Sequence, residues 1–262
     1  MPTFPVQRWS AEGCETVEDH VAEEEPLAVE LRHGPVAERK RSPATTTMRT
    51  PGHDADLAVG WLYTERHIGM AADVIGIVQV EPNLIRVDLH PEVEIDLARF
   101  ARAGYASSAC GLCGKTLLDV WEDDLPKLAA TPHMTWELVT ALPAKLAAMQ
   151  PQFHQTGGVH AAATFSAAGE LRAVREDVGR HNALDKLLGA ALIDDDLAGP
   201  IVLTTARAGF ELVQKCAVAG IPVLIAVGAP TSLAVQTARR VGMTLIGFLR
   251  GDRFNVYAGT IT

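Results

Sequence analysis

Two cysteines three residues apart stand in the segment Ser-Ser-Ala-Cys-Gly-Leu-Cys-Gly-Lys, residues 107–115. Thiols at the spacing of Cys110 and Cys113 can share a metal ion, close a disulfide or pass sulfur between them. The flanking glycines let the backbone come close to whatever the thiols meet. Which of these three chemistries applies decides what the protein does.

The surrounding residues favour one of the three. A structural zinc site needs two more Cys or His ligands, and Cys14 and Cys216 are isolated in the sequence. A thioredoxin-type redox pair begins a helix directly after a strand, but serines and an alanine precede Cys110. A solvated loop that presents a nucleophilic thiolate fits better. We therefore expect Cys110 and Cys113 to be the catalytic pair, with no metal site.

A second motif, residues 156–163, contains His160 and partially resembles the His-x-Glu half of zinc nucleoside deaminases, whose other half is Pro-Cys-x-x-Cys. The order is reversed, because both cysteines precede His160. Ala162 also stands where the proton-shuttling glutamate would be, so that a deaminase would lack its general acid and base. A lone histidine near the start of a strand is more often structural than catalytic, and we interpret His160 in this way.

Charged residues crowd a third segment, residues 175–186, where a strand end meets a helix start. Asp177 can cap the helix or accept hydrogen bonds from a guanine edge, and Gly179 lets the backbone approach a ligand. Arg180 and His181 would face an anion near the positive end of the helix. An ordinary charge-rich helix start would give the same pattern, so both interpretations stay open.

Three loops follow expected buried strands, at residues 206–209, 228–232 and 250–253. Ligands of parallel α/β sheets bind beyond the carboxyl ends of the strands. Arginines such as Arg207, and glycines with hydroxyl groups such as Thr231 and Ser232, are suited to phosphate oxygens. We expect a phosphate-rich ligand here, although ordinary solvated loops are the alternative and no P-loop or Gly-x-Gly-x-x-Gly motif is present.

The elements that must position these motifs divide into four stretches. Residues 1–25 are polar and acidic and are expected to form a loose tail or an edge strand. Residues 26–105 are expected to form a small α+β domain, and residues 106–150 the Cys-x-x-Cys loop with a helical connection. Within these stretches we expect strands at 27–31 and from 33, an exposed loop at 39–43, helices at 54–67, 117–125 and 136–149, and a hairpin of 74–80 with 84–89.

Residues 151–262 have the more regular pattern. Strands that are apolar on both faces alternate with helices, which indicates a parallel sheet covered on both sides. A hairpin at its start makes the sheet mixed, so the fold class is α/β with α+β character. The expected elements are a hairpin of 159–165 with 171–175, helices at 182–192, 210–219 and 231–241, and strands at 201–205, 222–227 and 244–249.

Composition narrows the possible functions. The 262 residues carry a formal net charge of −9, which argues against a general nucleic-acid or membrane-surface binder. Residues 1–5 lack the layout of a signal peptide, and no apolar stretch approaches the ~18 residues of a membrane span. Four cysteines are too few for a disulfide scaffold. We expect a cytoplasmic protein.

Taken together, these residues resemble the FdhD family, the formate dehydrogenase accessory sulfurtransferases. The likeness extends from about residue 25 to residue 257. It rests on six segments in the family's order, at residues 108–115, 156–162, 175–186, 210–215, 229–235 and 247–250.

The resemblance implies a cytidine-deaminase-like sheet in the C-terminal domain and a cytoplasmic homodimer. It also implies that sulfur from a cysteine desulfurase is carried on Cys110, assisted by Cys113. The sulfur would pass to the molybdenum or tungsten bis-guanine-dinucleotide cofactor of formate dehydrogenase, here a bound substrate. The family's cofactor-binding stretch, which GDP or GMP would also fit, matches Phe248, Leu249, Arg250, Gly251, Asp252 and Arg253. A non-covalent escort of the cofactor is the alternative.

Two departures from the family pattern bear on ligand fit. Family members usually have Ser-Gly-Arg where this chain has Thr205-Ala206-Arg207. We therefore expect the backbone at Ala206 to approach a ligand less closely. Residues 39–46 also look inserted relative to the usual second strand.

Overall fold

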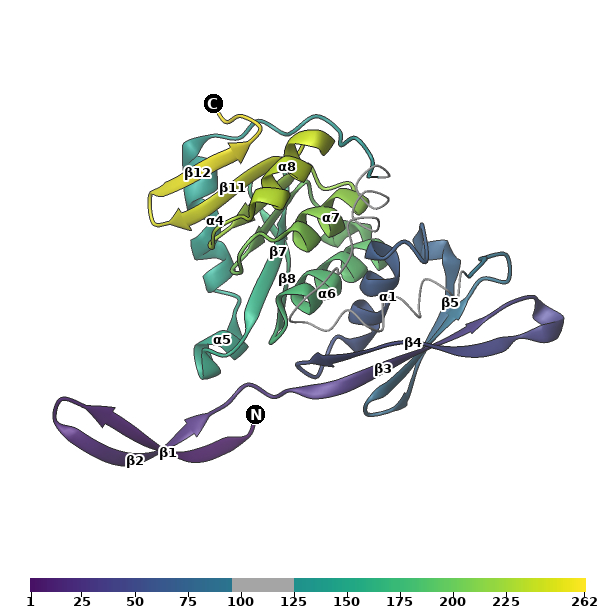
Figure 1. Cartoon of the computed structure of the whole chain (residues 1–262), viewed down its shortest axis with the longest axis horizontal. Coiled ribbons are helices and arrows are strands. Elements are labelled where there is room, and N and C mark those ends of the chain that lie inside the picture. Colours follow the sequence, from purple (N-terminus) through teal and green to yellow (C-terminus); the bar gives the residue numbers. More distant parts are fainter. Residues whose placement is uncertain (96–124) are drawn as a thin grey trace.

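The computed structural model describes residues 1–95 and 125–262, which form three separate sheets (Figure 1). The catalytic candidates Cys110 and Cys113 lie outside the described residues. The helix expected at 117–125 lies outside them as well, apart from its last residue.

The N-terminal residues form a β-hairpin rather than a loose tail or an edge strand. Strand β1 (Thr3–Ser10) pairs antiparallel with β2 (Gly13–His20), and the hairpin projects from the rest of the chain (Figure 1). Val6 and Val17, which face each other across the hairpin, are its only half-buried strand residues. Gly13, at φ 128°, makes the turn that the polar composition did not reveal.

The second sheet has the order β4-β3-β6-β5. Strands β3 and β6 are parallel, and the outer strands pair antiparallel. Helix α1 (Asp54–Thr64) packs on the sheet, burying Leu57 and Leu62 against Leu27, Val29 and Leu31. The other elements of this unit are β3 (Glu25–His33), η1 (Val36–Glu38), β4 (Lys40–Arg49), η2 (Ala71–Asp73), β5 (Val74–Glu81) and β6 (Leu84–Leu89). The predicted helix and the predicted hairpin of β5 and β6 are confirmed.

The loop expected at residues 39–43 was wrong, because β4 occupies most of it. Strand β3 pairs with β4 as far as Lys40. A register shift between Val29 and Glu30 leaves Ala44 as an extra residue in β4. Pro43, which suggested an interruption, is tolerated because β4 is an edge strand.

The third and largest sheet has the order β12-β11-β10-β9-β7-β8. Its middle strands β9, β10 and β11 are parallel, while β7, β8 and β12 make the antiparallel pairings. The mixed α/β class is therefore confirmed; the likeness to cytidine deaminases stays a prediction. The strands are β7 (His160–Phe165), β8 (Leu171–Asp177), β9 (Ile201–Thr204), β10 (Val223–Ala226), β11 (Thr244–Arg250) and β12 (Arg253–Ala258). Strand β12 was not expected.

Helices cover both faces of this sheet. One face packs against α6 (Arg180–Ile193), α7 (Phe210–Val218) and α8 (Ser232–Val241). The other packs against α4 (Trp136–Ala147), and the short α5 (Pro151–Thr156) and η3 (Asp195–Leu197) complete the connections. Successive strand residues point to opposite faces, so Val202 joins the first core while Ile201 and Leu203 join the second.

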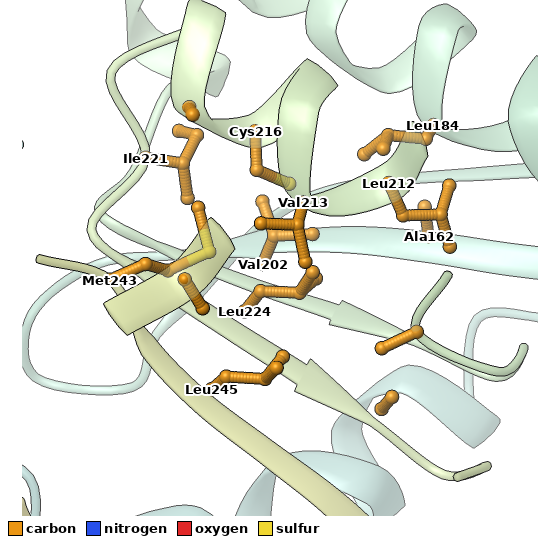
Figure 2. Close-up of a cluster of buried hydrophobic side chains, with 14 of the residues drawn as sticks. Ala162, Leu184, Val202, Leu212, Val213, Cys216, Ile221, Leu224, Met243 and Leu245 are labelled. Carbon is orange, nitrogen blue, oxygen red and sulfur yellow. The ribbon is translucent and has the colours of Figure 1, made fainter. Parts of the chain in front are cut away.

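Figure 2 shows the first core, in which α7 contributes Leu212, Val213 and Cys216. Cys216 is fully buried, as expected for a small core residue, and burial raises the pKa of its thiol well above the ordinary value. It is therefore poorly suited to carry sulfur. Cys14, by contrast, is an exposed free thiol.

Helices α1 and α6 join the second sheet to the third. Gly60 and Gly189 face each other at this contact, where either Cβ would overlap the opposite backbone. Within the part of the chain that the structure describes, no helix is long and apolar enough to span a membrane.

Candidate ligand site at the sheet edge

The predicted site loops gather at one edge of the largest sheet. Strands β9, β10 and β11 end there, and α7 and α8 begin directly after β9 and β10. Strand β7 runs antiparallel to β9, with Ala162 opposite Thr204, so its first residue, His160, reaches the same edge. Strand β8 ends opposite His160, and α6 begins three residues later. The edge thus unites strand ends and helix starts, where ligands bind in α/β proteins.

Backbone hydrogen bonds connect the loops of this edge. The Ala161 N–H donates to Thr205 Oγ1 at 2.9 Å. The Ala208 N–H donates to the Ala229 carbonyl at 3.2 Å. At the far end, the Phe248 N–H donates to the Gly228 carbonyl at 3.1 Å. The loops therefore form one connected rim rather than independent flexible segments.

Two glycines in the rim permit close backbone packing. A Cβ on Gly228 would lie 2.8 Å from the Arg207 Cα, and one on Gly247 would lie 2.8 Å from the Pro230 Cδ. Arg207 itself is exposed. The close contact with Gly228 therefore holds the backbone from which the exposed Arg207 side chain extends.

The turn between β11 and β12 carries a hollow at this edge. Its volume is about 270 Å³, and its lining residues are Phe248, Arg250, Arg253, Phe254 and Asn255. Both arginines are exposed, and neither forms an ion pair with any described residue. Phe248 has a φ of 55°, a left-handed conformation that is uncommon for an aromatic residue. The turn combines guanidinium groups with two aromatic rings.

The other predicted residues of this turn differ in accessibility. Leu249 is only 2% exposed, because strand alternation points it into the core under the sheet. It is not available to a ligand, contrary to our expectation. Gly251 and Asp252 are exposed at the tip, where the Asp252 carbonyl accepts a hydrogen bond from the Trp136 indole at 2.9 Å.

Thr231 and Ser232 lie at the start of α8. The Thr231 hydroxyl caps this helix by accepting from the Ala234 N–H at 3.4 Å. Ser232 is the first residue of the helix and is exposed. Of the two hydroxyl groups expected to face a ligand, that of Thr231 is used as the helix cap. Ser232 is therefore the better candidate.

Asp177 is fully buried, and its carboxylate is occupied by protein partners. Oδ2 lies 2.7 Å from Lys186 Nζ and accepts from the Thr50 N–H at 3.1 Å. Oδ1 accepts from the Gly179 N–H at 2.8 Å and from Asn182 Nδ2 at 3.3 Å. A carboxylate has about four acceptor positions, so none is left for a guanine edge. Burial and these partners argue against the ligand role expected for Asp177; the residue ties α6 to the segment after β4.

The neighbouring charges of this segment are also used internally. Arg175 Nη2 lies 2.8 Å from Asp56 Oδ2. The Glu176 carboxylate accepts from the Gln152 and Phe153 N–H groups at the start of α5. The density of charge that suggested a binding site thus reflects contacts between elements.

A second buried network joins three helices. Lys215 Nζ lies 3.0 Å from Asp185 Oδ2 and 2.9 Å from Glu65 Oε1, and it also donates to Thr64 Oγ1. These contacts connect α7 to α6 and α1. The charge pairs of residues 175–186 therefore leave Arg180 and His181 as the members that can serve the edge.

His181 meets a residue that our sequence analysis had not selected. Its Nε2 lies 2.6 Å from Glu211 Oε2, on the first turn of α7. The close contact with His181 lowers the pKa of Glu211 below its ordinary value. Nearby, burial together with the charge of Arg180 lowers the pKa of His160. The edge thus holds a cluster of two histidines, an arginine and a carboxylate.

Glu211, Phe254 and Asn255 could have been selected from the sequence. Glu211 follows the loop that contains Arg207, at the start of the next helix. Arg207 was selected because ligands bind beyond the carboxyl ends of parallel strands, and the same reasoning applies to Glu211. Phe254 and Asn255 follow Arg253, but without β12 in the expected pattern there was no reason to fold them back on Phe248.

Two alanines on which the motif arguments depended, Ala206 and Ala162, are buried in the first core. Ala206 is 3% exposed and its methyl group lies in the first core, so it does not narrow the edge. Ala162 is fully buried in the same core. A glutamate at position 162 would face apolar side chains, which counts further against the deaminase interpretation.

The described residues contain a second hollow, away from the edge, but no metal-binding cluster. A larger hollow of about 530 Å³ lies beside the end of α1, between His67 and His90, and none of the predicted site residues lines it. In residues 1–95 and 125–262, no group of three or more Cys, His, Asp or Glu side chains is arranged to hold a metal ion.

Comparison with known structures defines the class of protein to which this fold belongs. A crystal structure described as a formate dehydrogenase accessory protein, from Desulfotalea psychrophila, matches with a TM-score of 0.79 at 25% identity. The match covers 98% of this chain and 97% of the other. The whole described architecture is thus shared with a protein described as a formate dehydrogenase accessory protein.

Sequence comparison identifies the family. The FdhD/NarQ family model matches residues 22–261. A sulfur carrier protein FdhD of Streptomyces coelicolor is 45% identical over 259 residues, covering 92% of this chain and 88% of the relative. One from Thermoplasma volcanium is 39% identical over 260 residues, covering 96% and 92%. The chain belongs to the FdhD/NarQ family.

Proposed function

We propose that this protein is a sulfur carrier that takes persulfide sulfur from a cysteine desulfurase and transfers it to the guanine-dinucleotide cofactor of formate dehydrogenase. The names of the relatives support the sulfur-carrier role, and that of the Desulfotalea protein supports formate dehydrogenase as the recipient system. The cofactor, which contains molybdenum or tungsten, is the substrate. On this proposal the protein acts in the cytoplasm as a homodimer.

The arginine-lined turn is the observation that carries the ligand part of the proposal. Arg250 and Arg253 are exposed, free of ion pairs within the described residues, and adjacent to Phe248 and Phe254. Guanidinium groups bind phosphate oxygens in a two-pronged geometry, and aromatic rings offer faces for a base. A guanine nucleotide presents both chemistries, and a hollow of about 270 Å³ suits one nucleotide part rather than a whole bis-dinucleotide.

The sulfur step that we propose uses Cys110 and Cys113. The Cys110 thiolate attacks the outer sulfur of the desulfurase persulfide, which forms a Cys110 persulfide and releases the desulfurase thiolate. Cys113 then attacks the inner sulfur of that persulfide, forming a disulfide with Cys110 and releasing hydrosulfide. The hydrosulfide replaces one oxygen ligand of the substrate metal, and the oxygen leaves as hydroxide, which takes a proton from solvent to become water. A cellular thiol then reduces the disulfide.

Mass spectrometry after incubation with a cysteine desulfurase and free cysteine tests this step. We expect the mass of one sulfur atom on the peptide that contains Cys110 and Cys113, removable by a thiol reductant. Cys110→Ala should remove the adduct and abolish activation of formate dehydrogenase. Cys14→Ser is the matched control, because Cys14 is an exposed thiol far from these residues in the sequence.

The same experiment separates the alternative. A protein that escorts the cofactor without a covalent step would show no adduct, yet would still bind GDP. Activation of formate dehydrogenase by the Cys110→Ala, Cys113→Ala double variant would then persist. That result would contradict the sulfur-carrier proposal and leave the ligand site intact.

A further inference from the structure

The contact between His181 and Glu211 bridges the starts of two helices. His181 is the second residue of α6, and Glu211 is the second residue of α7. His181 Nε2 lies 2.6 Å from Glu211 Oε2, and neither residue forms another ion pair in the described part of the chain. Both helices begin at a glycine, Gly179 or Gly209, which supplies no side-chain cap. The pair is therefore the side-chain connection between these two helix starts.

An ionised carboxylate at this edge has an apparent disadvantage, because it would repel an anionic ligand. Two features offset the repulsion. The positive end of α7 stabilises a negative charge in its first turn. The imidazole Nε2 of His181 lies 2.6 Å from a carboxylate oxygen, and this contact lowers the pKa of Glu211. Glu211 is thus held toward α6 rather than toward a ligand.

The contact also determines which part of the imidazole remains available. With Nε2 lying against Glu211 Oε2, Nδ1 is the remaining polar atom of the ring. A carboxylate on one ring nitrogen sets the tautomer and the ring orientation, as it does for catalytic and metal-binding histidines. The charged groups around the pair are Arg180, Lys215, His160 and, beyond them, Asp177.

We propose that Glu211 is a positioning residue that fixes the tautomer and orientation of His181 for binding of the phosphate part of a guanine nucleotide. The inference rests on the proposed function, since it assumes that a nucleotide occupies this edge. It gives a role to Glu211, which lies in the matched segment 210–215 but was not among the site residues expected from the sequence. It also assigns separate tasks to neighbouring groups, in which His181 and Arg180 meet the ligand while Glu211 acts through His181.

Binding of GDP, measured by isothermal titration calorimetry, tests the inference with four variants. We expect His181→Asn and Glu211→Gln each to weaken binding by about tenfold, the loss typical of one hydrogen bond to a charged group. Because Glu211 acts through His181, the double variant should bind no more weakly than His181→Asn alone. Glu81→Gln is the control, because Glu81 is an exposed carboxylate at the end of β5, in the second sheet.

An NMR measurement on the imidazole gives a readout that a purely structural role would not move. In the wild-type protein without ligand, the His181 ring nitrogens should show a proton fixed on Nε2. In Glu211→Gln they should show a changed tautomer balance, and Glu211→Asp should restore the wild-type pattern in part.

The outcomes separate this inference from the proposed function. Unchanged GDP affinity in Glu211→Gln, or losses that add up fully in the double variant, would overturn the positioning role and leave the nucleotide site standing. A wild-type protein that does not bind GDP would overturn both. An unchanged His181 tautomer in Glu211→Gln would also overturn the positioning role, independently of any ligand.

Discussion

Gly60 of α1 and Gly189 of α6 pack backbone against backbone. A Cβ on Gly60 would lie 1.8 Å from the Asp185 carbonyl oxygen, and a Cβ on Gly189 would lie 2.0 Å from that of Asp56. This approach brings the two helices close enough for Thr64 to donate to Asp185 at 2.8 Å. The glycine pair thus determines how the smaller sheet is attached to the helices that begin at the ligand edge.

Gly60→Ala should be strongly destabilising, because helix backbone rather than a flexible side chain occupies the space its methyl group would need. Overpacking of this kind costs about 1–3 kcal/mol and sometimes more. Urea unfolding monitored by circular dichroism would measure the loss. Gly69→Ala serves as the control, since its nearest neighbour would be an ordinary 3.7 Å away. Equal stability of the two variants would contradict the packing argument.

Lys186→Met should destabilise the fold by about 3–5 kcal/mol, because it leaves the buried carboxylate of Asp177 without its cation. Lys186 is 1% exposed and also donates to the Thr50 carbonyl at 2.7 Å. The double variant Asp177→Asn, Lys186→Met should recover part of the loss, since the uncompensated charge is gone. Denaturant unfolding near neutral pH compares the three proteins. A Lys186→Met protein as stable as wild type would refute the pairing.

Stability should fall as the pH drops below about 6.5. Burial lowers the pKa of His33 and of His160 below the ordinary value of 6.5, and nearby Arg39 and Arg180 lower them further. Below about pH 6.5 the unfolded chain binds protons that these folded histidines do not. The free energy of unfolding therefore decreases as the pH falls. The effect is absent above that range.

Denaturant unfolding at about pH 7.5 and about pH 5.5 checks this expectation. His160→Gln should show a smaller decrease than the wild-type protein, because one of the histidines responsible is missing. His20→Gln, at an exposed position of the hairpin, should leave the decrease unchanged. If the His160→Gln variant loses as much free energy of unfolding between the two pH values as the wild-type protein does, His160 is excluded as a contributor.

Removal of Arg250 or Arg253 should weaken GDP binding by about tenfold each while leaving the fold intact, since both side chains are exposed. The affinities of the Arg250→Ala and Arg253→Ala variants can be measured by calorimetry. Arg172→Ala is a suitable control, because Arg172 lies near the beginning of β8, at the opposite end from the edge. Equal losses in all three variants would argue for a general charge effect instead of a site.

Local patterns were sufficient to predict most elements of the third sheet. The apolar runs at β9, β10 and β11, and the stop at Gly242 after α8, are properties of short stretches of sequence. Strand β12 was missed because half of its residues are exposed and they do not form such a run. The strand at residues 40–43 was missed because Pro43 is compatible with β structure only at an edge, which depends on the sheet order.

Sequence patterns alone predicted most elements of the third sheet, its mixed character and the loops that meet at its edge, because side-chain periodicity and the chain order of parallel strands dictate them. Tertiary structure alone decided which charged residues remain available. Asp177 and Arg180 are three residues apart, and the sequence suggested both equally as ligand-binding residues. In the structure, the Asp177 carboxylate is bound by Lys186 and by the Thr50 N–H. Burial and partners come from distant segments, so no local pattern contains them.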